Sequence, residues 1–189
     1  MTPTDAELDK RAAAVRMILF DVDGVLTDGR VIVHTDGTES KSFFIRDGIA
    51  MVWAQRAGIK VGFLSARLSA TTPHRAAQLG ITLVYHGVTS KLATYERILA
   101  DHGLTDADIA YMGDDVVDLA VLNRVGLAMA PADCVEEVRS RSHLVTRAAG
   151  GAGAAREAIE RILRVQGRWE GIVEAYLNEP ADLAAHQIR

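Results

Sequence analysis

The sequence lacks the features that mark disulfide-bonded, membrane-spanning or nucleic-acid-binding proteins. It contains one cysteine, Cys134, so no internal disulfide can form and we expect a reducing, cytoplasmic setting. No apolar run approaches the ~20 residues of a membrane-crossing helix, and the acidic, polar first residues do not resemble a signal peptide. The net charge is only −4 and the basic residues form no cluster. We therefore expect neither nucleic acid nor a membrane as a partner.

The apolar residues instead fall into short runs that alternate with helical patterns. The runs with the character of strands are 17–21, 59–64, 81–85, 109–112, 126–130 and 144–145. The helical patterns are 46–57, 69–80, 91–103, a segment from 116 onward, and 154–165. This alternation predicts an α/β fold with a doubly wound, mostly parallel sheet. We expect one domain at 16–177, with a helical extension at 1–15 and a flexible tail at 178–189.

Local signals mark several boundaries. Thr4 followed by Glu7 is a capping-box pattern and predicts the start of the leading helix. Two β-like runs on either side of an Asp-Gly pair at 36–37 predict a β-hairpin inserted at 30–44. Ser69 is expected to cap the helix that follows it, because a serine side chain can accept a hydrogen bond from the first turn.

Acidic, hydroxyl and basic side chains lie where the expected strands end. Asp21 and Asp23 follow the first strand, Ser65 the second and Asp114 the fourth, and Lys91 begins a helix after the third. The carboxyl ends of parallel strands meet at one edge of a sheet, and open α/β sheets bind their ligands there. We therefore expect these residues to converge although they are far apart in the sequence.

This set of residues suits phosphoryl transfer. Asp21 is the candidate nucleophile, and Asp23 the acid and base that protonates the leaving oxygen and later activates water. Asp114 completes a Mg²⁺ site with the two other aspartates, because Mg²⁺ prefers carboxylate ligands. Ser65 and Lys91 are candidates to bind the phosphate oxygens. Each residue alone could be a turn residue, a helix cap or a surface charge, and their ordered coincidence favours catalysis.

The order of these residues resembles the haloacid dehalogenase (HAD) superfamily. The motifs that carry this resemblance are Asp21-Val22-Asp23-Gly24-Val25-Leu26-Thr27-Asp28, Ser65, Lys91 and Gly113-Asp114-Asp115-Val116-Val117-Asp118. Asp23 matches the phosphatase and phosphomutase branches, because the dehalogenases lack this acid. The resemblance implies a Rossmann-like core, with Mg²⁺ held by Asp21, the backbone carbonyl of Asp23, and Asp114. Asp115 and Asp118 are implied to support that site.

A narrower resemblance, over about residues 16–169, is to the 3-deoxy-D-manno-octulosonate 8-phosphate (KDO8P) phosphatases. The shared segments are 24–29, the hairpin, Phe44-Ile45-Arg46-Asp47-Gly48 and 150–157. The family implies a core without a cap domain, Mg²⁺-dependent hydrolysis of KDO8P, and a homotetramer assembled through the hairpins. The apolar hairpin residues Val31, Val33, Phe43 and Phe44 agree with such an assembly.

Substrate binding is assigned to Ser65, Arg67, Lys91, Arg46 and Gly48. The two arginines are candidates for the carboxylate of the sugar acid, because a guanidinium binds a carboxylate through two parallel hydrogen bonds. Ala66 and Ala50 stand where the family usually has glycine. Two alternatives remain open: a phosphatase of a nine-carbon ulosonic acid 9-phosphate, and a non-catalytic assembly or regulatory module. The intact acids and Lys91 argue against the module.

Overall fold

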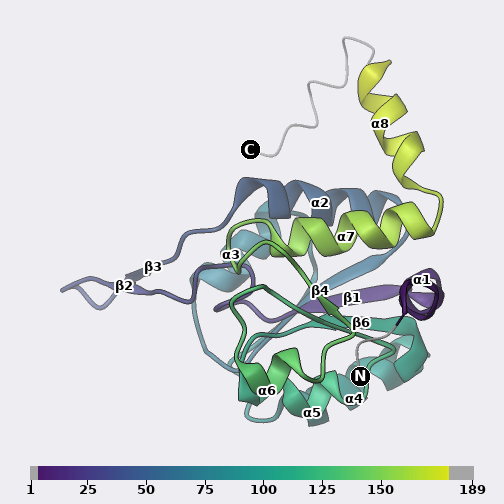
Figure 1. Ribbon diagram of the computed structural model, residues 1–189. Coiled ribbons are helices and arrows are strands. Elements are labelled where there is room, and N and C mark those ends of the chain that lie inside the picture. The colour runs from purple at the N-terminus through teal and green to yellow at the C-terminus, as the bar shows by residue number, and fades with distance from the viewer. Residues whose placement is uncertain (1–3, 179–189) are drawn as a thin grey trace.

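The computed structural model describes residues 4–178, which fold around a six-stranded parallel sheet (Figure 1). The strand order is β5-β4-β1-β6-β7-β8. The strands are β1 (Met17–Phe20), β4 (Lys60–Ser65), β5 (Leu83–His86), β6 (Ile109–Met112), β7 (Leu127–Ala130) and β8 (Leu144–Val145). A separate antiparallel hairpin consists of β2 (Ile32–Val33) and β3 (Glu39–Ser40). The predicted doubly wound α/β sheet with a hairpin insertion is confirmed. Of the expected tail, all but residue 178 lies outside the described residues.

Helices cover both faces of the sheet. The helices are α1 (Asp5–Ala14), α2 (Ile45–Arg56), α3 (Thr71–Gln78), α4 (Lys91–His102), α5 (Leu119–Leu122), α6 (Glu136–Arg139), α7 (Ala154–Val165) and α8 (Trp169–Leu177). Two 3-10 turns are η1 (Asp106–Asp108) and η2 (Val116–Asp118). In Figure 1, α2 and α7 lie above the sheet, and α4, α5 and α6 lie below it. None of the helices in residues 4–178 is long and apolar enough to cross a membrane.

The central strand β1 is buried on both faces. Ile18 and Phe20 pack with the residues of α2 and α7, whereas Met17 and Leu19 pack with those of α4 and α5. Side chains alternate along a strand, so a slip of one residue would exchange the two sets between the cores. This double burial fixes the register of β1 and therefore the position of Asp21, which follows it.

The strand order reverses beside β1. From β1 the chain builds β4 and β5 on one side, and then returns to build β6, β7 and β8 on the other. In open α/β sheets, ligands bind outside the carboxyl ends of the strands at this reversal. Here the reversal lies between β1 and β6, which are followed by Asp21 and Asp114 respectively.

The start of α3 differs from the expectation. The helix begins at Thr71, and its N-cap residue Ala70 makes no side-chain capping bond. The hydroxyl of Ser69 contacts Thr71 and donates to Glu39 of the hairpin instead. The expectation that Ser69 caps this helix was therefore wrong, because a carboxylate from a distant segment takes its hydroxyl.

Candidate active site

The candidate site lies at the carboxyl ends of β1, β4 and β6. Asp21 follows β1, Ser65 ends β4, and Asp114 comes two residues after Met112, the last residue of β6. The backbone amide of Asp21 donates to the carbonyl of Met112 at 2.9 Å, which keeps the two chain segments paired beyond the strand. Lys91 begins α4 and reaches the same place. The predicted edge of the sheet therefore gathers these predicted residues.

Lys91 bridges two of the acids. Its ammonium nitrogen lies 3.0 Å from Oδ1 of Asp21 and 2.6 Å from Oδ1 of Asp118. It also donates to the hydroxyl oxygen of Tyr111 at 3.2 Å. Burial lowers the pKa of Lys91, but the two carboxylates outweigh it and the net shift is upward. A charged ammonium is thus held beside the candidate nucleophile.

Asp118 is fully buried, and both of its oxygens are engaged. Oδ1 accepts hydrogen bonds from Lys91 and Tyr111, and Oδ2 accepts from the backbone amides of Asp114 at 3.0 Å and Asp115 at 3.3 Å. Asp115 is exposed, and its side chain accepts from the next amide in the chain, which closes the turn η2. Asp118 therefore orients the groups around it, and Asp115 shapes the turn.

Glycines determine the shape of the loop after Asp21. Gly24 has φ +90°, and a Cβ atom there would lie 2.0 Å from Oδ2 of Asp114. A Cβ atom on Gly150 would lie 1.8 Å from the carbonyl oxygen of Gly24, and one on Gly151 would lie 2.5 Å from the carbonyl carbon of Thr27. Only glycine permits such close backbone approaches. The glycine-rich segment before α7 therefore supports the loop directly.

The aspartates concentrate negative charge in a small buried volume. Carboxylate oxygens of Asp21, Asp114 and Asp118 lie within 4.8 Å of one another. Oδ1 of Asp114 is buried and accepts no hydrogen bond from residues 4–178. Burial, and then repulsion by Asp21 and Asp118, raises the pKa of Asp114 to about 7. Burial also raises the pKa of Asp21 to about 6, although Lys91 opposes it. This donor set fits a divalent cation that prefers oxygen ligands, such as Mg²⁺.

Asp23 is paired with a residue that sequence reasoning missed. The ammonium nitrogen of Lys41 lies 2.6 Å from Oδ1 and 2.9 Å from Oδ2 of Asp23. The side chain of Lys41 is 0% exposed, whereas that of Asp23 is 20% exposed. The sequence carried no signal for this pairing, because a lysine is usually exposed and its burial here is visible only in the structure.

Arg67 contacts the hairpin. Its two terminal nitrogens donate to the two carboxylate oxygens of Glu39 at 2.9 and 2.5 Å, and Ser69 donates to the same group. Arg67 and then Ser69 lower the pKa of Glu39 to about 2. The side chain of Arg67 is still 42% exposed. In this structure Arg67 therefore joins the hairpin to the loop after β4.

The two remaining predicted substrate residues lie in the first turn of α2. Arg46 is exposed and forms no ion pair with residues 4–178. Gly48 is buried, and a Cβ atom there would lie 2.5 Å from Nη2 of Arg75 and 3.0 Å from Leu79. Close packing of α2 against α3 thus accounts for the glycine. Roles for Arg46 and Gly48 in substrate binding stay predictions.

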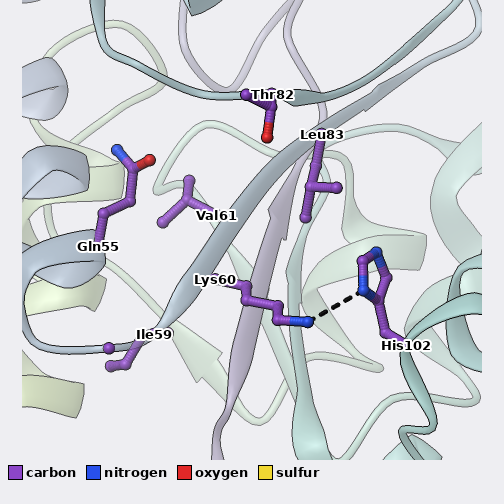
Figure 2. Close-up of a pocket in the computed structure, with 8 residues that line it drawn as sticks. Gln55, Ile59, Lys60, Val61, Thr82, Leu83 and His102 are labelled. Atoms are coloured by element: carbon purple, nitrogen blue, oxygen red, sulfur yellow. Dashed lines mark hydrogen bonds between the residues drawn. The ribbon is translucent and has the colours of Figure 1, made fainter.

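A cavity elsewhere in the molecule contains none of the predicted residues. Its volume is about 330 Å³, and its lining includes Lys60, Leu83 and His102 (Figure 2). Lys60 and Leu83 begin β4 and β5, so the cavity lies at the opposite edge of the sheet from Asp21. The Lys60 ammonium lies 3.0 Å from Nδ1 of His102 across it. The nucleophile candidate, the acid candidate and the acidic cluster are all absent from this cavity, so we do not assign catalysis to it.

Known proteins share both the sequence and the architecture. The 3-deoxy-D-manno-octulosonate 8-phosphate phosphatase KdsC of Escherichia coli (strain K12) is 37% identical over 166 residues, which are 88% of this chain and 88% of the relative. The chain belongs to the KDO8P phosphatase family of the HAD superfamily. Comparison with models of protein families gives no match.

Crystal structures of two KDO8P phosphatases superpose on the chain. The enzyme from Yersinia pestis gives a TM-score of 0.87 at 37% identity, covering 89% of this chain and 91% of that one. The enzyme from Moraxella catarrhalis, in complex with a magnesium ion, a phosphate ion and a KDO molecule, gives a TM-score of 0.89 at 31% identity. That match covers 92% of this chain and 99% of the other. The predicted superfamily and fold are confirmed along most of the chain.

Proposed function

We propose that the chain is a Mg²⁺-dependent phosphatase that hydrolyses KDO8P to KDO and phosphate through a phosphorylated Asp21. The observation that carries this function is the cluster of Asp21, Lys91 and Asp114 at the reversal of strand order. The Moraxella catarrhalis relative, which holds magnesium, phosphate and KDO, supports the choice of substrate. A nine-carbon substrate or a non-catalytic role has no comparable support.

The metal ligands in this proposal are Asp21, Asp114 and the backbone carbonyl of Asp23. When bound, Mg²⁺ would reduce the repulsion between the Asp21 carboxylate and the phosphate dianion. Asp118 belongs to the same cluster, but its oxygens already accept bonds from Lys91, Tyr111 and two backbone amides. We therefore assign Asp118 to orienting Lys91 and the loop rather than to binding the metal.

The side chains of the chain divide the reaction into two steps. In the first, a carboxylate oxygen of Asp21 attacks phosphorus, the bond from phosphorus to the sugar oxygen breaks, and Asp23 gives that oxygen its proton. In the second, Asp23 takes a proton from water as the water attacks the phosphorus of the acyl-phosphate, which frees phosphate and restores Asp21. Lys91 and Ser65 bind the phosphate oxygens in both steps. Arg67 and Arg46 stay assigned to the sugar, and Gly48 stays assigned to substrate binding.

The hairpins are proposed to assemble the enzyme into a homotetramer. Ile32 and Val33 are 63% and 75% exposed, whereas Phe43 packs partly against the core of its own chain. Exposed apolar side chains on a short strand favour association with another chain. A cytoplasmic location, and the division into an extension at 1–15, a domain at 16–177 and a tail at 178–189, are parts of the same proposal.

A phosphate-release screen tests the substrate. KDO8P, a nine-carbon ulosonic acid 9-phosphate and p-nitrophenyl phosphate are compared at equal concentration with Mg²⁺ and with EDTA. We expect KDO8P to give the highest kcat/KM and EDTA to stop release from every substrate. Equal activity on the eight- and nine-carbon acids would refute the substrate, and full activity in EDTA would refute the metal.

Asp21→Asn tests the nucleophile. The amide is a much poorer nucleophile, so we expect phosphate release from p-nitrophenyl phosphate to fall by at least roughly 10³-fold. Asp101→Asn, an exposed change near the far end of α4, is the matched control and should keep wild-type activity. Substantial turnover by the Asp21 variant would exclude the phosphorylated aspartate.

A further inference from the structure

The steps proposed above give no task to Lys41, which is buried at the catalytic edge. It directly follows β3 and its side chain is 0% exposed. An ammonium group removed from water costs several kcal/mol unless a nearby charge compensates. Among the residues that the structure describes, Asp23 is the acid that forms an ion pair with it. The hairpin thus delivers a buried positive charge to the proposed acid and base.

The geometry of this pair restricts Asp23. One ammonium group lies 2.6 Å from Oδ1 and 2.9 Å from Oδ2, so it contacts both oxygens of the carboxyl group. Rotation of the carboxyl away from this arrangement would break at least one contact. The contact to Oδ2 is a hydrogen bond, whereas the one to Oδ1 is an ion-pair contact without hydrogen-bond geometry. A charged hydrogen bond of this kind is among the strong ones in proteins.

The hairpin is itself held in place near Lys41. Glu39 precedes Lys41 by two residues, and in an extended segment such residues point to the same side. Arg67 and Ser69, which follow β4, both bind the carboxylate of Glu39. The segment from Glu39 to Lys41 is therefore joined to the catalytic edge by two ion pairs, one of which ends on Asp23.

We propose that Lys41 is a positioning residue that directs the carboxyl group of Asp23 toward the ester oxygen of the substrate. This inference rests on the proposed function, in which the O–H bond of Asp23 breaks as the leaving oxygen gains the proton. Lys41 takes no proton in this step. It fixes the rotation of the donor and stabilises the carboxylate that remains, which then acts as the base toward water.

Two aryl phosphates test this role. Phenolate is a poor leaving group and needs the proton of Asp23, whereas 2,4-dinitrophenolate leaves without it. We expect Lys41→Met to lower kcat/KM for phenyl phosphate by about 10²-fold and that for 2,4-dinitrophenyl phosphate by less than about threefold. The parameter kcat/KM is chosen because it reports the steps up to the first phosphoryl transfer. Asp23→Asn should show the same selectivity.

Lys60→Met is the matched control, because Lys60 begins β4 at the opposite edge of the sheet and lines the cavity drawn in Figure 2. It should change neither rate. Lys41→Gln serves if the methionine variant does not fold, and it should show the same selectivity with a smaller loss. Thermal unfolding with and without Mg²⁺ checks each variant, and we expect Mg²⁺ to raise the melting temperature of both Lys41 variants as it does for the wild type.

The outcomes separate this role from others. Equal losses on both phosphates would overturn the inference, because they would mean that Lys41 binds phosphate or supports the fold. In the Asp23→Asn background, Lys41→Met should cause no further loss on phenyl phosphate, and an additive loss would also overturn it. If the Asp23 variant loses more activity on phenyl phosphate than on 2,4-dinitrophenyl phosphate but the Lys41 variant does not, only the role of Lys41 is rejected. If the Asp23 variant loses equal activity on both phosphates, the role of Asp23 as the acid is rejected, and the inference about Lys41 is rejected with it.

Discussion

Among single residues, Asp118 has no proposed role in bond breaking, yet it contacts several other residues of the site. It joins Lys91 and Tyr111 to the turn that presents Asp114. Since it is fully buried, bulk water does not compete for these contacts, and removing its carboxylate is costly. Its loss would leave buried donors without an acceptor and Lys91 with Asp21 as its remaining carboxylate partner.

Asp118→Ala is therefore expected to reduce the free energy of unfolding by about 3 kcal/mol. Asp115→Ala removes a neighbouring acid that is exposed and caps the turn η2, and it should cost only about 1 kcal/mol. Urea unfolding of both variants measures the difference. Similar losses in the two would show that the buried contacts of Asp118 do not set its importance.

Substrate choice gives a second prediction at this scale. Arg67→Lys should lower kcat/KM for KDO8P more than for p-nitrophenyl phosphate, by about 1–3 kcal/mol, because lysine cannot form the paired bonds of a guanidinium. Arg46→Lys is measured in parallel. Equal losses on both substrates would show that neither arginine recognises the sugar, and would leave Arg67 with its contact to Glu39.

The positions of Asp21, Ser65, Lys91 and Asp114 could be predicted because one rule, that parallel strands end at one edge, places them all. Lys41 could not, because its pairing with Asp23 depends on how the hairpin folds back, and no local pattern encodes that path. The sequence therefore left undetermined those contacts of the site that join residues far apart in the chain.

At the scale of elements, the apolar strands and the long helices α2, α4 and α7 were predicted to within two residues, because each has a clear periodicity. The four-residue helix α6 was not predicted, since it is too short to show one. The contact between α2 and α7 was also not predicted. Asp47 in the first turn of α2 accepts from the backbone amide of Arg156 at 2.7 Å, near the start of α7.

The burial of Asp47 at this contact predicts a pH dependence of stability. Burial is the main cause that raises the pKa of Asp47 to about 6, so the folded state binds a proton more tightly than the unfolded state does. The contribution of Asp47 to stability is therefore greatest below about pH 4 and is lost as the pH rises through 6. Asp47→Asn keeps an accepting oxygen but cannot ionise.

Relative to that variant, the wild type should lose up to about 3 kcal/mol of stability between pH 4 and pH 7, at 1.36 kcal/mol per pKa unit. Urea unfolding across this range measures the difference, in which the other titrating groups cancel. A difference that stays constant with pH would show that Asp47 titrates alike in the folded and unfolded chain.

At the scale of the whole molecule, the hairpin extends away from the body that the other elements form (Figure 1). Val33→Glu would place a charge where the proposed tetramer buries an apolar side chain, and should dissociate the assembly into smaller species. Thr35→Glu adds the same charge at an exposed position of the hairpin and is the comparison. Light scattering gives the mass in solution. A monomeric wild-type protein would refute the tetramer whatever either variant does.

The contact of Gly150 and Gly151 with the loop after Asp21 has a consequence for synthesis of the protein. The ribosome makes the loop early, but the segment that supports it emerges only after β8. A nascent chain can therefore carry its nucleophile long before it can shape the loop around it. Domains tend to fold as units during translation. A product truncated before Gly150 should accordingly be inactive, so incomplete chains would release no phosphate from the metabolites around them.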